Sequence, residues 1–432
     1  MSELDAARCR IPLESFASID SEVLPASTSS RFSFKYIDIS SAAEGRLTLP
    51  SESMDFADAP SRARRVLRQH DVIMSTVRPN LKAFAYCKFD AGNFIASTGF
   101  AVLRAKENAE PYFLLCAILS DDVSRQVERL AVGSNYPAIS SSDVRRLLIP
   151  NFPLARQRKV AAILTSLDTA IEKTEALIEK HQQIKAGLMH DLFTRGVLPN
   201  GQLRPSHEQS PELYRDTEIG VIPQSWNVGS LASLVSSDIT YGIVQAGPHV
   251  EGGVPYVRTG DMSNDYLDRS EMLCTSRVIA NAYSRSEVRA GDIIVSIRAT
   301  VGKVLPVPQE LDGANLTQGT ARVAARHGVD RLFLLWALRQ RRFQERVTAV
   351  IKGTTFAEIT LAALRQVPLA IPNGYAEQVA VAQRLQGCED FLQAEIKQHE
   401  KLRLQKLGLM QDLLTGKVPV TVEAGISEPT DA

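Results

Sequence analysis

The chain has 432 residues, of which 44% are hydrophobic and 23% are charged, a composition typical of a folded protein with two or more domains. No run of eighteen apolar residues occurs and MSELDAARCR is not a secretory signal, so we expect neither a membrane span nor export. The five cysteines lack metal-ligand spacing, which predicts reduced thiols in a cytoplasmic protein. The formal net charge of +0 disfavours a uniformly basic nucleic-acid binder, but it permits local basic patches within a larger assembly.

Residues 1–152 carry mixed strand and helix signals and predict a mixed α/β domain. The run DVIMSTV is short, apolar and β-branched, as in a strand, and residues 110–131 have the pattern of an amphipathic helix. Arginine outnumbers lysine here, and its planar fork suits contact with guanine or phosphate. The candidate DNA contacts in this region are Arg62, Arg64, Arg65, Arg78, Asn80 and Lys82.

A long helix is predicted over residues 153–197, beginning at the second proline of IPNFP. Its apolar residues alternate at spacings of four and three, the 3.5-residue period of a coiled-coil seam. Gly187 is expected to interrupt the helix before its apolar ending, LMHDLF. The predicted seam residues are Val160, Leu164, Leu167, Ile171 and Ile178.

After a predicted linker at 198–213, residues 214–372 predict a second mixed α/β domain. It has a strand-like run, DIIVSIR, and a helical pattern over residues 330–350 on which Arg339, Arg341 and Arg342 are expected to form a solvated face. The candidate DNA contacts in this region are Arg258, Arg298, Thr300, Lys303 and Arg322.

A second long helix is predicted over residues 373–418, with Gly408 as a late interruption, followed by a flexible tail at 419–432. Its seam has the same period as that of the first helix. The predicted seam residues are Val381, Leu385, Cys388, Leu392 and Leu402.

The two halves of the chain repeat one another. An offset of 221 positions places Gln157 over Gln378, Lys185 over Lys406, and GLMHDLFTRGV over GLMQDLLTGKV. Upstream, HDVIMSTVR resembles GDIIVSIR and STGFAVL resembles TQGTARV, but the match is weaker. This difference indicates one fold used twice with different surfaces.

Each helix of about 40 residues would be roughly 60 Å long and must bury its apolar stripe. We expect the two helices to pair antiparallel around a pseudo-two-fold axis. The alternative is that each helix packs only on its own domain.

No catalytic or metal-binding motif is recognisable in the sequence. LLTGKV is not a phosphate-binding loop, IPNFP is not the base-holding loop of an adenine methyltransferase, and the ExK spacing of AEIK lies in a helix with charge patterning. We therefore expect no catalytic residues and no metal or cofactor bound by this chain.

The helix endings, the doubled organisation and TEIGVIPQSW together resemble the specificity subunit of type I restriction-modification systems, the HsdS family, over nearly the whole chain. The resemblance implies two target-recognition domains that each read half of a bipartite, asymmetric double-stranded DNA sequence, with the helices as a ruler between them. It also implies two modification subunits that methylate adenine with S-adenosylmethionine, and restriction subunits that use ATP and magnesium. The specificity subunit itself would be non-catalytic.

Two other interpretations stay open from the residues alone. The chain could be a two-domain coiled-coil scaffold for partner enzymes that does not bind DNA, or an enzyme with an unrecognised site. The ruler hypothesis has a distinct consequence: four residues added to one helix lengthen it by about 6 Å, close to two base pairs.

Overall fold

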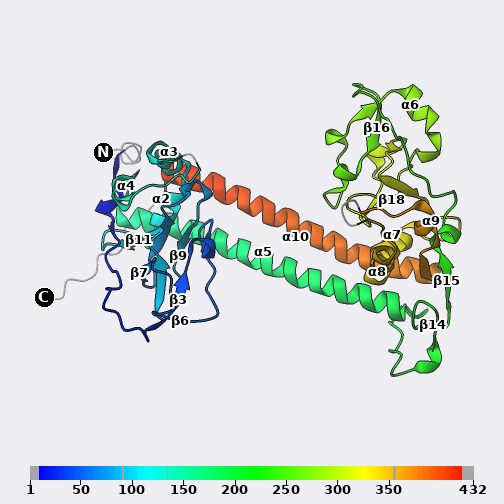
Figure 1. Cartoon of the computed structure of the whole chain (residues 1–432), viewed down its shortest axis with the longest axis horizontal. Coiled ribbons are helices and arrows are strands. Elements are labelled where there is room, and N and C mark those ends of the chain that lie inside the picture. Colours follow the sequence, from blue (N-terminus) through cyan, green and yellow to red (C-terminus); the bar gives the residue numbers. More distant parts are fainter. Residues whose placement is uncertain (1–8, 90–91, 134, 354–356, 421–432) are drawn as a thin grey trace. The chain divides into compact units, whose positions relative to one another are not determined.

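The computed structural model describes residues 9–89, 92–133, 135–353 and 357–420. By its internal contacts the chain divides into two units, residues 1–176 with 397–432 (unit 1) and residues 177–396 (unit 2). The division passes through both long helices, α5 (Leu154–Arg195) and α10 (Tyr375–Thr415), so each begins in one unit and ends in the other (Figure 1). Of the predicted tail, residues 421–432 lie outside the described residues.

In its described residues, unit 1 has two four-stranded sheets, a two-stranded sheet of β4 and β5, and three short α-helices. The sheet orders are β6-β3-β10-β7 and β2-β11-β8-β9, and β1 pairs with β12 directly before α5. The strands are β1 (Arg10–Pro12), β2 (Ala17–Ile19), β3 (Ser33–Ile37), β4 (Ala42–Ala43), β5 (Arg46–Leu47), β6 (Met54–Asp55), β7 (Ala63–Leu67), β8 (Val72–Ser75), β9 (Phe84–Tyr86), β10 (Phe94–Ser97), β11 (Phe100–Ala105) and β12 (Leu148–Pro150); the helices are α2 (Pro111–Leu119), α3 (Asp121–Leu130) and α4 (Ser141–Arg146).

Unit 2 repeats this connectivity with smaller sheets, ordered β17-β16-β20 and β19-β18-β21. The parallel pair β3–β10 has a counterpart in β16–β20, and β1–β12 has one in β15–β22, directly before α10. The strands are β13 (Tyr214–Arg215), β14 (Ile222–Pro223), β15 (Trp226–Ser230), β16 (Val254–Val257), β17 (Cys274–Thr275), β18 (Ile293–Ser296), β19 (Val304–Pro306), β20 (Asn315–Leu316), β21 (Thr320–Val323) and β22 (Pro368–Pro372); the helices are α6 (Arg277–Ala282), α7 (Arg331–Arg339), α8 (Arg341–Ala349) and α9 (Leu361–Gln366). The predicted mixed α/β class with long helices is confirmed at this level.

The single amphipathic helix predicted in each half is wrong, because each is broken into two. Ser120 separates α2 from α3 and Gln340 separates α7 from α8, both in an extended conformation. The Ser120 side chain accepts the Val123 N–H, which caps α3 and favours the break. Only α3 and α8 are amphipathic in their burial, since α2 is buried on nearly every side. The hydrophobic pattern over residues 110–131 therefore covers two helices, α2 and α3, which differ in burial.

Arg339 contradicts the prediction of a solvated arginine face. Its guanidinium lies 5.2 Å from the centre of the Trp336 ring, its Nε donates to the Val304 carbonyl at 3.0 Å, and burial lowers its pKa. Arg341, in contrast, is exposed. Arg339 ends α7 and Arg341 begins α8, so the break between these helices gives the two side chains different surroundings.

The endings of the long helices are parts of the domain cores. In unit 1, Leu413 and Leu414 of α10 share a core cluster with Val160 and Leu164 of α5. In unit 2, Leu192 and Phe193 of α5 join the core that contains Val381 and Leu385 of α10. The repeated ending of each helix thus completes the apolar core of the other half of the chain.

The predicted interruptions at Gly187 and Gly408 are wrong. Both glycines lie inside continuous helices, and a Cβ added to either would have no neighbour within 4 Å. A glycine in a helix interior costs roughly 0.5–1 kcal/mol relative to alanine, which is too little to end a helix whose next turns are buried in a core.

A buried glutamine fixes the start of each long helix. The Gln157 side chain accepts the Glu110 N–H at 2.9 Å, and Gln378 accepts the Asp330 N–H at 2.8 Å. Each amide also donates to the carbonyl of the residue at the end of the preceding segment, Phe152 or Pro372. The two repeats therefore use the same contact to join helix and domain.

The predicted linker begins with an ordered connection between α5 and α10 in unit 2. Arg204 is nearly buried and pairs with Glu377 at 2.5 Å, and the same carboxylate accepts the Trp226 indole N–H at 2.9 Å. Breaking such a buried pair leaves an unpartnered charge. In the described part of the chain, no helix has the length and apolar composition of a membrane span.

Candidate nucleic-acid interface

In unit 1, several predicted DNA contacts gather around the turn between β10 and β11. The Thr98 N–H donates to the Arg62 carbonyl at 2.8 Å, and Thr76, directly after β8, donates its N–H and its hydroxyl to the Gly99 carbonyl at 2.8 and 2.9 Å. A Cβ on Gly99 would lie 2.9 Å from Ile39 Cδ1, so a larger residue there would require the Ile39 side chain to shift. Arg62 and the loop after β8 therefore lie at one edge of the unit.

The loop after β8 presents its polar side chains in a constrained backbone. Arg78 and Lys82 both have left-handed backbones (φ 47° and 49°) on either side of a 3-10 turn at Pro79–Leu81. Left-handed backbone conformations are unfavourable for residues other than glycine, and they cluster at functional sites. Arg78 and Asn80 are exposed, and the Arg78 guanidinium lies 4.3 Å from the centre of the Tyr136 ring.

The three arginines around β7 have different environments. Arg62 Nε donates to the Tyr36 hydroxyl at 3.1 Å, and Arg64 lies over the Phe56 ring at 4.7 Å. Arg65 instead forms an ion pair with buried Asp20 at 2.9 Å. Arg62 and Arg64 are thus held by aromatic side chains with their charge available, whereas Arg65 is occupied inside the unit.

Lys82 is also directed inward. Its Nζ donates to the Leu119 carbonyl at 3.3 Å and lies 3.9 Å from Asp121. This places its charge at the junction of α2 and α3 and makes it a weaker DNA-contact candidate than Arg78.

Unit 2 has the corresponding turn between β20 and β21. The Gly319 carbonyl accepts the Ile297 N–H at 2.8 Å and the Thr259 hydroxyl at 3.3 Å. A Cβ on Gly319 would lie 2.4 Å from that hydroxyl oxygen and 3.9 Å from the Arg298 Cβ. The structure therefore brings Arg258, directly before Thr259, and Arg298 to the edge that matches the unit 1 edge.

The candidate cations of unit 2, Arg258, Arg298, Lys303 and Arg322, are each paired with a carboxylate. Arg258 pairs with Asp261 at 2.6 Å, and this hydrogen bond raises the pKa of the arginine. Arg298 pairs with Glu358 at 2.9 Å and stays partly exposed. Thr300 is exposed, and its carbonyl accepts the Ser296 hydroxyl.

Lys303 and Arg322 do not join this edge. Lys303 pairs with Asp265 at 2.5 Å and lines a recess with Lys185 and Glu389 of the long helices. Arg322 is mostly buried against Asp292 at 2.6 Å. Both side chains are held by contacts within unit 2.

The sequence match between HDVIMSTVR and GDIIVSIR misleads at its last residue. The shared contact to the turn glycine makes Thr76 equivalent to Ile297, so Arg78 corresponds to Ala299, which also has a left-handed backbone (φ 60°). Arg298 therefore takes the place of Val77. The two units present different side chains from the same loop.

Sequence reasoning missed the aromatic side chains of unit 1, above all Tyr136, which is exposed beneath Arg78. An aromatic residue in a polar, Gly- and Pro-containing loop is a usable signal, since bases stack on such rings.

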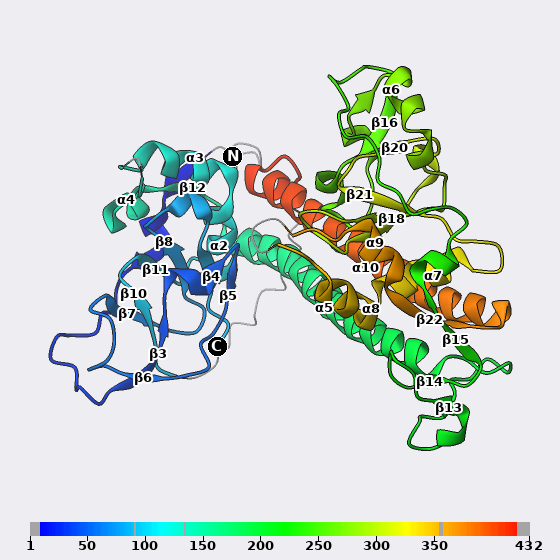
Figure 2. The same ribbon diagram turned by 45° about the vertical axis from the view of Figure 1, so that its right-hand side comes forward.

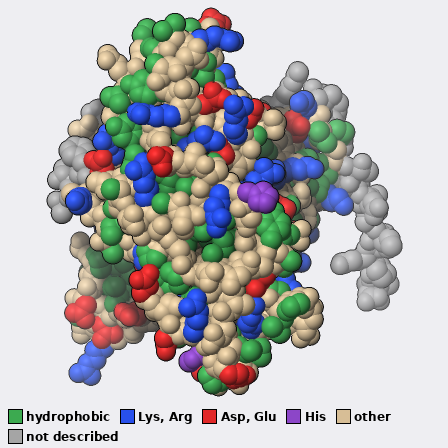
Figure 3. Space-filling model, turned by 90° about the vertical axis from the view of Figure 1, so that its right-hand side faces the viewer, with side chains coloured by type: hydrophobic (Ala, Val, Ile, Leu, Met, Phe, Trp, Pro, Cys, Tyr) green, Lys and Arg blue, Asp and Glu red, His purple; other side chains and the backbone are tan. Residues whose placement is uncertain are grey.

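The charges of the face in Figure 3 are mixed, with blue Lys and Arg interspersed among red Asp and Glu. Within the described ranges, no group of three or more His, Cys, Asp or Glu could hold a metal ion.

The predicted seam residues lie on the long helices with graded burial. Those that are buried are Val160, Leu164, Ile171, Val381, Leu385 and Leu392, and those that are partly buried are Leu167, Ile178, Cys388 and Leu402.

The structure thus defines a class of mixed α/β proteins with two similar domains, which present different side chains at equivalent turns, and two long helices. The sequence pattern described as "Type I restriction modification DNA specificity domain" matches residues 66–181 and 223–405, more than half of the chain. The chain therefore belongs to this family. Recognition of DNA targets in a type I restriction-modification system, predicted from the sequence, is confirmed, and the family provides specificity while its partner subunits provide catalysis.

Individual relatives agree with this assignment. The inferred MjaX specificity subunit of a type I restriction enzyme from Methanocaldococcus jannaschii is 28% identical over 330 residues, which are 74% of this chain and 71% of the relative. A chain from the structure "Structural basis underlying complex assembly and conformational transition of the type I R-M system" is 25% identical with a TM-score of 0.57, covering 95% of this chain and 98% of that one. The type I S subunit from M. genitalium shares the fold, with a TM-score of 0.58 at 14% identity over 94% and 96% of the two chains.

Proposed function

We propose that each unit reads one half of a bipartite, asymmetric double-stranded DNA target. The observation that carries this is the equivalent turn glycine, Gly99 or Gly319, surrounded by different side chains in the two units. The turns of the two units have equivalent backbone contacts, which supports the same placement of each unit on DNA. Their side chains differ, which supports contacts to different bases. In unit 1 the contacts would come from Arg78 and Asn80, with Arg62 and Arg64 beside them. In unit 2 they would come from Arg298, Thr300 and Arg258.

We further propose that α5 and α10 form one antiparallel coiled coil around a pseudo-two-fold axis and set the distance between the half-sites. Contacts within each unit support this. In unit 1, Asp168 pairs with Lys406 at 2.5 Å, and in unit 2, Glu389 pairs with Lys185 at the same distance. These pairs correspond to each other under the 221-residue offset.

The partners follow from the same proposal. Two adenine methyltransferase subunits, which hold S-adenosylmethionine, would assemble on this chain in the cytoplasm, and restriction subunits would add ATP- and magnesium-dependent translocation and cleavage. The near-neutral charge supports a reader that depends on these partners for much of its phosphate contact. One copy of the methyltransferase per repeat suits the equivalence of the two halves.

The test is methylome sequencing of cells that express this chain with its cognate methyltransferase subunit. We expect a two-part motif in the wild type. Arg78→Ala and Asn80→Ala should relax one half of that motif only, since loss of a bidentate base contact costs roughly 1–3 kcal/mol of discrimination. Arg298→Ala should affect only the other half.

Arg125→Ala is a matched control, because Arg125 is an exposed arginine of unit 1 on α3, where it pairs locally with Asp122. It should leave the motif unchanged. A single contiguous motif, or variants of one unit that alter both halves, would contradict the assignment of one reader to each half-site.

A further inference from the structure

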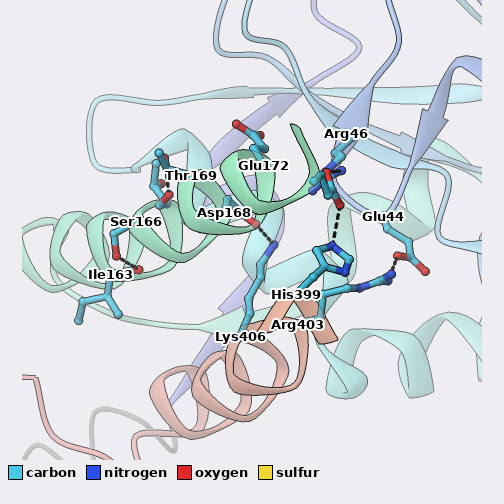
Figure 4. Close-up of polar contacts among 12 residues, drawn as sticks. Glu44, Arg46, Ile163, Ser166, Asp168, Thr169, Glu172, His399, Arg403 and Lys406 are labelled. Carbon is cyan, nitrogen blue, oxygen red and sulfur yellow. Dashed lines mark hydrogen bonds and ion pairs between the residues drawn. The ribbon is translucent and has the colours of Figure 1, made fainter. Parts of the chain in front are cut away.

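The turn between β4 and β5 of unit 1 contacts both long helices. Arg46 Nη1 lies 2.6 Å from Glu175 Oε2 on α5, and Arg403 Nη2 on α10 lies 2.8 Å from Glu44 Oε2 (Figure 4). From the end of β9, Lys88 adds a contact to Glu172 of α5 at 3.3 Å. Three side chains of the recognition domain thus hold two helices that belong to distant parts of the sequence.

The helices present matched stripes of charge at this place. On α5, Asp168, Glu172 and Glu175 are spaced by four and three residues, so they share one face. On α10, His399, Arg403 and Lys406 have the same spacing with basic side chains.

Glu175 joins all three bodies. One carboxylate oxygen accepts from Arg46 and the other contacts His399 Nε2 at 2.9 Å. Burial acts to raise the pKa of Glu175, but the hydrogen bonds from Arg46 and His399 more than offset it and leave the pKa lowered. The carboxylate is therefore ionised at neutral pH and can serve both contacts at once.

These contacts lie away from the apolar attachment of the domain to the helices. On α5 that attachment runs from Val160 to Leu167, whereas Glu175 is eight residues beyond Leu167, about 12 Å at 1.5 Å per residue. A domain attached at one patch can pivot about it. A second attachment about 12 Å away limits the pivot, because a displacement of about 1 Å there corresponds to only about 5° of rotation.

The second repeat does not require these charges. Under the 221-residue offset, Glu175 corresponds to Ile396 and His399 to Ile178, whereas the pair Asp168–Lys406 keeps its counterpart Glu389–Lys185. The kept pair joins helix to helix. The ion pair between Arg46 and Glu175, which ties α5 to the domain, has no counterpart at Ile396. This contact is therefore a property of unit 1, and the fold does not require it.

We propose that Glu44, Arg46 and Lys88, with their helix partners Glu172, Glu175 and Arg403, form an ionic clamp that holds the first recognition domain at one angle on the helices and so fixes the register of its half-site against the spacer. This inference rests on the proposed two-reader function. It identifies Glu44 and Arg46 as positioning residues, because their side chains contact the long helices. Exposed ion pairs are individually weak and are screened by salt, so the clamp should tune the angle without deciding whether the unit folds.

The test uses the double variant Glu44→Ala, Arg46→Ala in the full chain, assembled with its methyltransferase subunit. Methylation is measured on a DNA library in which both half-sites are constant and the spacer varies by single base pairs, at low and at high salt. We expect the wild type to prefer one spacer at low salt. The variant should methylate spacers one base pair longer or shorter about two- to five-fold more, relative to the preferred spacer, with both half-sites unchanged. High salt should move the wild type toward the variant.

Charge exchange provides the rescue. Glu44→Arg alone should broaden spacer use, and Glu44→Arg with Arg403→Glu should narrow it again, which a general loss of stability would not do. Arg341→Ala is the matched control, because the ion-pair partner of Arg341 among the described residues is Glu345 of its own helix α8. It should keep the wild-type spacer preference.

A double variant with wild-type spacer preference at both salts, or a charge exchange that fails to restore it, would overturn the clamp. Thermal unfolding monitored by circular dichroism checks that each variant is folded. Failure of the wild type to recognise two half-sites would instead count against the two-reader function, so the two results are separable.

Discussion

Adding four residues to both long helices should lengthen the DNA spacer while leaving both half-sites unchanged. The insertions belong after Ala176 in α5 and after Ile396 in α10, where the chain passes between the units. The ion pairs Asp168–Lys406 in unit 1 and Lys185–Glu389 in unit 2 then stay on their own sides of the inserts. An insertion in α5 alone would leave α10 too short to reach both cores.

The magnitude has two components. Four residues add about 6 Å of rise and about 40° of rotation beyond a full turn. One base pair adds about 3.4 Å and about 35°. The rotation therefore fits one additional base pair and the rise is nearer two, so we expect the preferred spacer to grow by one or two base pairs. The rise alone, without the rotation, corresponds to about two base pairs.

Methylome sequencing of the matched-insertion variant measures this outcome directly, and the variant inserted in α5 alone is the control. The control should lose activity or stability, because it shifts one helix against the other. An unchanged spacer in a folded, active matched variant would refute the ruler. A changed half-site would show that the helices do more than set distance.

Three further outcomes follow from the structure. Gly187→Ala should stabilise unit 2 by about 0.5–1 kcal/mol, because the position is helical with open space around it. Leu192→Ala in the same helix should destabilise unit 2 by about 2–5 kcal/mol, because it leaves a cavity in the core. Denaturant unfolding compares the two variants, and equal effects on the free energy of unfolding would contradict the placement of this helix end. Exposed Cys9 should react rapidly with Ellman's reagent, while Cys116, whose pKa burial raises to about 12, should react only after denaturation. Loss of the fast reaction in Cys9→Ser would confirm the assignment, and its persistence would refute it. Glu377→Gln should destabilise the chain by roughly 3–5 kcal/mol, since it leaves nearly buried Arg204 without its counter-charge, and a neutral effect on the unfolding midpoint would exclude that pair.

Periodic and local features were predictable from the sequence. The 3.5-residue period located both long helices, and the β-branched runs around Ile73 and Ile294 are strands β8 and β18. Such patterns depend on residues within a few positions of each other. The breaks at Ser120 and Gln340 were missed because both sides of each break are helical, and only a cap separates them.

The candidate DNA contacts were less predictable, since an arginine's partner is often distant in sequence. Arg65 pairs with Asp20, 45 residues away, and Arg298 pairs with Glu358, 60 residues away. Composition alone does not distinguish these from Arg78, which lies on an aromatic ring with no carboxylate partner among the described residues. The fold separates arginines that hold the domain together from those whose charge is available to a phosphate or base.

The exchange of helix ends between the cores has a consequence for synthesis on the ribosome. The first core needs Leu413 and Leu414, which are made about 250 residues after Leu164; at about 5–20 residues per second this is a delay of roughly 12–50 s. Until then the apolar surface that those leucines cover stays open on the nascent chain. The second core, in contrast, receives Leu192 and Phe193 before its own strands are made. The half of the protein that is synthesised first is therefore completed last, and chaperone binding to nascent chains should be concentrated on the first domain.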